Sequence, residues 1–176
     1  MNKNPILFFI ILCSFSWLQS HGQDYLRKKE QKFAYKLFEG EPDAELLHIP
    51  DWNFAGKELF MEDDRLFLLK RQNMVLGYLL ITRALGRYDY FDYIVAYAPD
   101  LSVMGLSILI YPSSHGAAIC QRAWLSQFEG YAGQELTLGK DIDAVAGATI
   151  SARSMIRDMK RTYQFMVSLK EEGIIQ

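Results

Sequence analysis

The stretch YFDYIVAYAPDLSVMGLSILIY, residues 90–111, decides the fold class of this chain. Its two halves, residues 90–98 and 103–111, are rich in β-branched, leucine and aromatic residues, which favour β-strands. Pro99 and Asp100 lie between the halves and are typical turn formers. Because so short a link cannot hold a crossover helix, we expect the two strands to be antiparallel neighbours.

Two more strands precede this pair. Residues 65–71 (RLFLLKR) and 75–82 (VLGYLLIT) have the same strand-forming composition. Gln72 and Asn73 separate them from each other, and Gly86 separates the second from the strand that follows. Four strands with short links predict an antiparallel meander.

Helical patterns flank these strands. Residues 24–39 have apolar side chains at helical spacing and stop before Gly40. Residues 116–130 return to that spacing after the strands, and residues 150–170 form the longest pattern. The fold is therefore predicted to be α+β: an antiparallel sheet with an N-terminal helix and a long C-terminal helix packed on it.

The long C-terminal helix is expected to have one side on the sheet and the other in water. Its apolar side consists of Ala152, Met155, Ile156, Met159, Tyr163 and Met166. Its solvent side is expected to hold Arg153, Arg157, Lys160 and Arg161. In the shorter helical pattern at 116–130, Trp124, Phe128 and Cys120 are expected to be buried.

The first residues are typical of an export signal. Lys3 supplies a positive start, residues 5–18 are nearly all apolar, and small residues lie just before a cleavage point after Gly22. A secretory signal peptide over 1–22 predicts an extracytoplasmic protein, periplasmic or on the cell surface. The alternative is a retained membrane anchor. Residues 23–74 then form an N-terminal helix with an irregular, short-strand segment, and residues 75–170 form the main domain.

Composition excludes several classes of function. The formal net charge is −2, from 19 basic and 21 acidic residues, so the basic excess of nucleic-acid binders is missing. The two cysteines are Cys13 and Cys120, and removal of the signal would leave Cys120 alone, with no intramolecular disulfide. With three histidines in the chain, no His/Cys metal site is expected. There is also no G-x-G-x-x-G pattern for a nicotinamide dinucleotide.

The stretch DIDAVAGATISARSM, residues 141–155, carries the candidate site. Gly147 and Ala148 precede Thr149 where the long helix is expected to begin, and the free N–H groups of a helix start bind phosphate well. A phosphoester on Thr149 would then have Ser151 as a second hydroxyl and Arg153 as a nearby positive charge. The alternative is structural: a threonine N-cap, with Asp143 as a turn former.

The heptapeptide D-A-V-A-G-A-T, residues 143–149, resembles the flavinylation motif D-x-x-[S/T]-G-A-[T/S] of the FMN-binding domain family. That family includes the C subunit of the sodium-pumping NADH:quinone reductase and the G subunit of the Rnf complex. HGAAICQRAWLSQFEG, residues 115–130, is similar to a segment that precedes the motif in one branch. The resemblance covers roughly residues 75–167.

This resemblance implies that Thr149 carries FMN through a phosphoester, installed by a separate flavin transferase that uses FAD. It assigns Asp143 a role in that modification, and Gly147 and Ala148 the role of giving access to the threonine. The chain would then be an exported electron-transfer flavoprotein that relays electrons between redox partner proteins or within a membrane redox complex. The resemblance therefore implies an electron-transfer flavoprotein or a component of a redox complex, and not an enzyme that acts on its own.

The His115-Gly116 step is expected to lie near the flavin, with His115 hydrogen-bonding it; the alternative is a loop histidine exposed to water. Two departures from the family pattern stand out. Ala146 replaces the motif's Ser or Thr, and the loop before His115 lacks the expected arginine and acid. They favour a second hypothesis, a binding or structural module of the same fold without flavin. A third, a small flavin reductase, lacks any acid–base constellation in the sequence.

Overall fold

The computed structural model describes residues 26–50, 52–113 and 115–176, so the predicted signal peptide at 1–22 lies outside the described residues. The described chain forms one five-stranded antiparallel sheet in which the spatial order of the strands follows the sequence. The strands are β1 (Asp43–Leu47), β2 (Arg65–Arg71), β3 (Met74–Leu85), β4 (Tyr90–Tyr97) and β5 (Val103–Ile110).

The predicted meander is confirmed, with two refinements. β3 continues to Leu85, three residues past the predicted end, and pairs with β4 without interruption. β1 comes from the segment expected to be irregular with short strands, and it extends the sheet by pairing with β2. The sheet therefore runs without a break across residue 75, where the sequence placed the start of the main domain.

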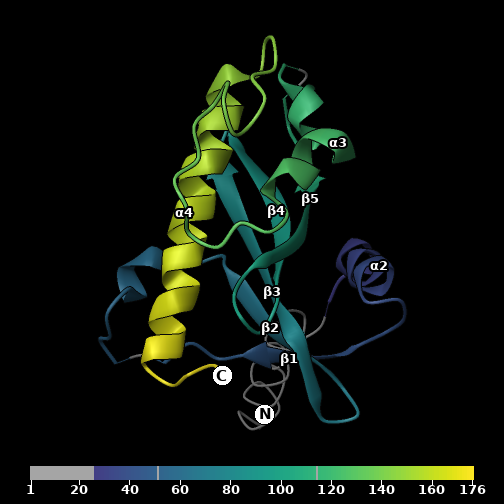
Figure 1. Cartoon of the computed structure of the whole chain (residues 1–176), viewed down its shortest axis with the longest axis vertical. Helices are drawn as coiled ribbons and strands as arrows, with labels where there is room; N and C mark the ends of the chain where they lie inside the picture. The colour runs from purple at the N-terminus through teal and green to yellow at the C-terminus, as the bar shows by residue number, and fades with distance from the viewer. Residues whose placement is uncertain (1–25, 51, 114) are drawn as a thin grey trace, which may run out of the picture.

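One helix covers each face of the sheet (Figure 1). The long helix α4 (Thr149–Glu171) lies along one face, where Met155 and Met159 are buried in a core with the aromatic residues of β4. The shorter α2 (Lys28–Leu37) covers the other face, with Ala34 buried. The α+β fold predicted from the sequence is thus confirmed.

The predicted helix at 116–130 is wrong as a single element. The chain forms three short turns instead: η2 (Ala117–Cys120), α3 (Arg122–Leu125) and η3 (Ser126–Phe128). Gln121 takes an extended conformation, with φ −72° and ψ 135°, which interrupts helical hydrogen bonding. Trp124 and Phe128 are nevertheless buried as predicted, with ring centroids 5.3 Å apart. Cys120 is half-buried.

The solvent-facing position predicted for Arg161 is also wrong. Its guanidinium turns toward the sheet, where Nε lies 2.6 Å from Asp158 Oδ1 and Nη1 lies 3.1 Å from Asp64 Oδ2. Nη2 donates to Thr82 Oγ1 at 2.7 Å, and Tyr93 donates to Asp158 Oδ2 at 2.7 Å. Asp158 is buried on α4 one turn before Arg161, so the arginine neutralises a charge that the solvent cannot reach.

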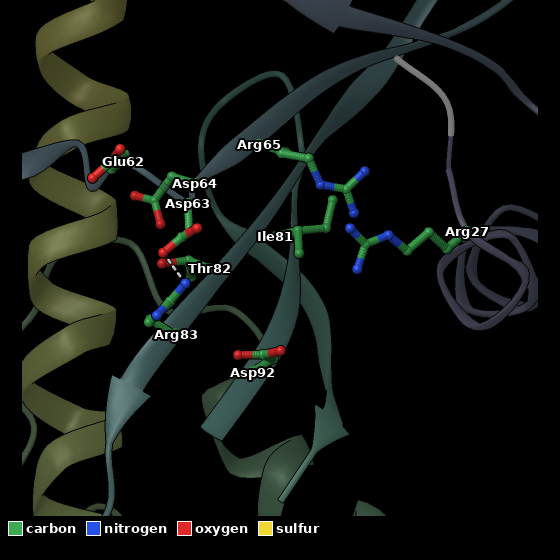
Figure 2. A pocket seen from close by; sticks show the side chains of 9 residues that line it. All are labelled: Arg27, Glu62, Asp63, Asp64, Arg65, Ile81, Thr82, Arg83 and Asp92. Carbon is green, nitrogen blue, oxygen red and sulfur yellow. Dashed lines mark hydrogen bonds and ion pairs between the residues drawn. The ribbon is translucent and has the colours of Figure 1, made fainter. Parts of the chain in front are cut away.

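A polar cavity of about 170 Å³ lies beside this network (Figure 2). Asp63 and Asp64 lie on one side of it, and the guanidinium groups of Arg27 and Arg65 lie on the other. Arg83 forms an ion pair with Asp63 across its lower edge. Asp64 forms its ion pair with Arg161 of the network, and Arg65 forms its ion pair with Glu30 of α2.

Candidate functional site

The helix α4 begins at Thr149, and the residue before it, Ala148, holds the N-cap position. No side chain caps the helix, and Thr149 is exposed, with no hydrogen bond from its hydroxyl to any described residue. The interpretation of Thr149 as an N-cap is therefore wrong. The cause is local: Gly147 takes φ +75°, and the turn from Val145 to Ala148 starts the helix immediately before the threonine.

The backbone around Thr149 leaves donors free. The first helical hydrogen bond joins the Ala152 amide to the Ala148 carbonyl at 2.9 Å. The amides of Thr149, Ile150 and Ser151 therefore have no backbone acceptor among the described residues. A Cβ built on Gly147 would meet no atom within 4 Å, so the approach to these amides is open. This arrangement suits an anionic group bound at the threonine.

Asp143 is held in place through its backbone. The Trp124 indole donates to the Asp143 carbonyl at 2.9 Å, and the Asp143 amide donates to Gln127 Oε1 at 2.8 Å. Gln127 in turn donates to the Trp124 carbonyl at 3.1 Å. The carboxylate itself remains exposed. These hydrogen bonds join the segment around Trp124 to the segment around Asp143. The order of the two segments along the chain is evident from the sequence, but their contact is not.

The His115-Gly116 step packs directly on the start of α4. Gly116 has φ +82°, and a Cβ there would lie 3.3 Å from the Ala148 Cα and 3.4 Å from the Gly147 oxygen. Such a Cβ would also lie 2.7 Å from the Tyr111 hydroxyl. Glycine is therefore required both by the backbone conformation and by the close approach. The exposed His115 is carried to the same end of the molecule as Thr149.

Tyr111 also belongs to this site, although the sequence did not identify it as a site residue. Its hydroxyl donates to the His115 carbonyl at 2.9 Å and lies 3.0 Å from Ser151 Oγ. Because the single tyrosine proton goes to the carbonyl, Ser151 donates to Tyr111. In the sequence, Tyr111 is an aromatic residue at the end of a predicted strand, shortly before the His115-Gly116 step. That pattern does not show whether the ring only fills the core or whether its hydroxyl bridges two segments.

The predicted site residues differ in their exposure and in the contacts they make. Gly147, Thr149 and Gly116 lie together at the start of α4, where Ala148 is buried. The Asp143 carbonyl is held by the Trp124 indole. Ser151 is buried, and its hydroxyl bonds to Tyr111, so its role as a direct ligand stays a prediction. Arg153 is exposed and has no hydrogen bond or ion pair with any described residue, so it is available to a bound anion.

Thr149 lies on an exposed part of the molecule. Neither the cavity in Figure 2 nor a larger groove beside α2 is lined by residues of the 143–149 motif. Exposed apolar side chains occur on the first turn of α4, at the end of β5 and around the β3–β4 turn: Ile150, Ile110, Leu85, Tyr88 and Tyr90. In the described part of the chain, no cluster of three or more His, Cys, Asp or Glu could hold a metal ion. No helix there is both long and apolar enough to cross a membrane.

Comparison with known proteins supports the fold. No protein-family model matches this chain, and no curated protein matches it. Among solved structures, the crystal structure of NqrC from Shewanella oneidensis is similar, with a TM-score of 0.51 and 18% sequence identity. The match covers 71% of this chain and 67% of NqrC. At this identity the similarity shows an NqrC-like fold, which confirms the resemblance to the FMN-binding domain family at the level of the fold.

Proposed function

We propose that this chain is a flavin-binding electron-transfer protein that carries FMN through a phosphoester on Thr149. The observation that carries the proposal is the state of that hydroxyl. It is exposed at the first residue of α4 and caps no helix, and the amides of residues 149–151 beside it have no backbone acceptor in the part of the chain that the structure describes. The common structural role of a threonine near a helix start, the N-cap, is not filled by Thr149, because Ala148 holds that position.

The residues present fit a phosphorylated group. The free amides and the positive end of the α4 dipole would hold the phosphate, and Arg153 would add a charge from the next turn. The open side of Gly147 would admit the group to the hydroxyl. When bound, FMN supplies redox chemistry that accepts one or two electrons, while the protein supplies attachment and orientation.

The proposal also includes a transferase that attaches the flavin, a position outside the cytoplasm and a surface for the flavin ring. A separate flavin transferase would recognise the motif at Asp143, which Trp124 and Gln127 present with its carboxylate in water. The NqrC-like fold and residues 1–22 support an extracytoplasmic position with redox partners at a membrane. The exposed His115 and the apolar side chains near Ile150 are the surface on which the flavin ring would lie.

A second candidate function rests on Ala146. This residue is exposed in the turn before Gly147, at the motif position where the family pattern has Ser or Thr. If that hydroxyl is needed for the transfer, the chain remains unmodified and acts as a binding or structural module of the same fold. The two functions differ in one measurable property, covalent flavin.

The test is expression of the whole chain with a flavin transferase, followed by in-gel flavin fluorescence under denaturing conditions. Wild type and Thr149→Ser are expected to fluoresce, Thr149→Ala is expected to be dark, and the exposed Thr137→Ala serves as the matched control that stays fluorescent. A dark wild type beside a fluorescent Ala146→Thr would establish the unmodified module. Fluorescence that survives Thr149→Ala would overturn the assignment of the attachment residue.

A further inference from the structure

The outer strand of the sheet next to α2 has peptide groups without backbone partners among residues 26–50, 52–113 and 115–176. β5 is the last strand in the order β1-β2-β3-β4-β5, so only β4 pairs with it along its length (Figure 1). One end of its free edge is closed, because Val103 exchanges hydrogen bonds with Gly130 and Tyr131 at 2.7 and 2.9 Å. The remaining edge, residues 104–108, has no such neighbour among the described residues.

The register shows which peptide groups face outward. The β3–β4 hairpin closes with a hydrogen bond from the Gly86 amide to the Asp89 carbonyl, and its register is uninterrupted. Because pairing alternates along an antiparallel ladder, the even-numbered residues of β4 face β5, where Ile94 pairs with Ser107 and Ala96 with Gly105. The amides and carbonyls of Leu106 and Ile108 therefore point away from the sheet.

These outward groups lie in a groove of about 450 Å³ between α2 and the α3–η3 segment. Its apolar lining includes Phe33 and Leu37 from α2 and Leu125 from α3. A volume of this size holds a few residues of extended chain or a small molecule. Its floor is the edge of β5, which is the surface that an added strand requires.

The rim of the groove is strongly basic. Lys29, Lys32 and Lys36 come from one side of α2, Arg122 comes from α3, and Glu129 is the acidic residue in the lining. Lys29 already reaches across to β5 and donates to the Leu109 carbonyl at 2.9 Å. An open carbonyl of this edge thus already attracts a donor from within the chain.

We infer that this groove binds an extended, acidic peptide segment of a partner protein by strand addition to β5. The backbone of the segment would pair with Leu106 and Ile108, its alternate side chains would enter the apolar lining, and its carboxylates would meet the lysines of α2. No residue of the 143–149 motif lines the groove. This inference therefore does not depend on the flavin.

The charges argue against a second copy of this chain as the occupant. Pairing two β5 edges would bring Lys29, Lys32, Lys36 and Arg122 of one copy against the same residues of the other. Like charges at an edge are a common device against self-pairing. An acidic partner removes that repulsion, so the same side chains that prevent self-association select the partner.

The experiment starts with the whole wild-type chain and a displayed library of random octapeptides. The most enriched sequence is synthesised and titrated into the ¹⁵N-labelled chain, with amide shifts mapped by NMR. Two versions of the peptide are N-methylated on alternate residues, which blocks one hydrogen-bonding edge in each. Ile108→Pro removes the outward amide of the receptor; proline is tolerated at such edge positions. Should that variant misfold, Lys32→Glu/Lys36→Glu tests the same groove without altering the backbone.

The expected result is enrichment of acid-rich peptides whose shifts map to residues 104–109. Affinity should fall about tenfold in Ile108→Pro, as for loss of a hydrogen bond, and in one N-methylated version but not the other. Equal binding of both N-methylated peptides, or no binding at millimolar peptide, overturns the inference. The inference is also overturned if laurate displaces a probe bound in the groove and no peptide displaces it. That result would indicate a small-molecule pocket. Concentration-dependent dimers that Ile108→Pro abolishes would instead identify a second copy.

Discussion

Ser151 Oγ lies 3.0 Å from the hydroxyl of Tyr111, which itself donates to the His115 carbonyl at 2.9 Å. This bridge joins the end of β5 to the first turn of α4 and holds the loop between them over Ala148. Tyr111→Phe removes both hydrogen bonds, neither of which is fully buried. It is expected to lower the free energy of unfolding by about 1 kcal/mol and to slow flavin attachment. Urea unfolding and in-gel fluorescence measure the two effects. The exposed Tyr88→Phe is the control, and an equal change in both variants would contradict the bridge.

Gly116 offers a test that separates strain from contact. Its φ of +82° is matched by the φ of +87° at Gly139, where a Cβ would meet nothing within 4 Å. Alanine at either position bears the cost of the left-handed conformation, about 1 kcal/mol. Only Gly116→Ala also forces the loop away from Ala148 and Tyr111, so it should unfold at lower urea concentration and attach flavin more slowly than Gly139→Ala. Identical behaviour of the two variants would show that the contact with Ala148 is unimportant.

The hydrogen bonds of Gln127 fix the motif acid. Gln127→Ala removes both its bond from the Asp143 amide and its bond to the Trp124 carbonyl. We expect a loss of about 1–2 kcal/mol in unfolding free energy and slower flavin attachment, because Asp143 is no longer held for the transferase. Gln164→Ala, an exposed change on α4 without hydrogen bonds to described residues, should alter neither. Normal attachment in Gln127→Ala would place recognition elsewhere.

Arg161→Met should be strongly destabilising. It would leave the buried carboxylates of Asp158 and Asp64 without their cation, which typically costs about 3–5 kcal/mol. Arg157→Met, one turn earlier on the exposed side of α4, should change the unfolding free energy by less than about 0.5 kcal/mol. Chemical denaturation of both variants gives the comparison. Similar values for the two would mean that the buried ion pairs contribute little.

The raised pKa of the buried Asp64 carboxyl predicts an unusual dependence of the unfolding free energy on pH. Burial raises its pKa above the ordinary value of 3.8, and this outweighs the hydrogen bond to Thr82 and the attraction of Arg161. The folded state therefore holds this proton more tightly than the unfolded chain, so stability is lost as the pH rises from 3.8 through the raised pKa. The unfolding free energy of wild type minus that of Asp64→Asn should fall over this range and then level. A rise would show that the attraction of Arg161 dominates.

Several features could be read directly from the sequence because they depend on local periodicity. The alternation within 90–111 predicted two strands, and the three-four rhythm of 150–170 predicted α4 to within one residue at each end. The motif at 143–149 predicted the place of Thr149 at a helix start. Even the correct fold class followed, because short links between apolar strands leave few arrangements that bury them.

Other features are properties of packing between distant segments. The sequence put Trp124 in the core, but only the fold brings its indole to the Asp143 carbonyl, 19 residues away. Gly116 is required because the loop after β5 crosses the start of α4, and Arg161 turns inward because Asp64 is brought beside it from the loop before β2.

By itself, therefore, the sequence determined four strands of the sheet, the helices α2 and α4, their order and the threonine at the start of the long helix. Local backbone preference and side-chain spacing are sufficient for those. The tertiary structure decided that Thr149 is free of any cap, that Tyr111 bridges His115 and Ser151, and that the edge of β5 lies in a basic groove. Each of these depends on which distant surfaces meet when the two faces of one sheet are buried under α2 and α4.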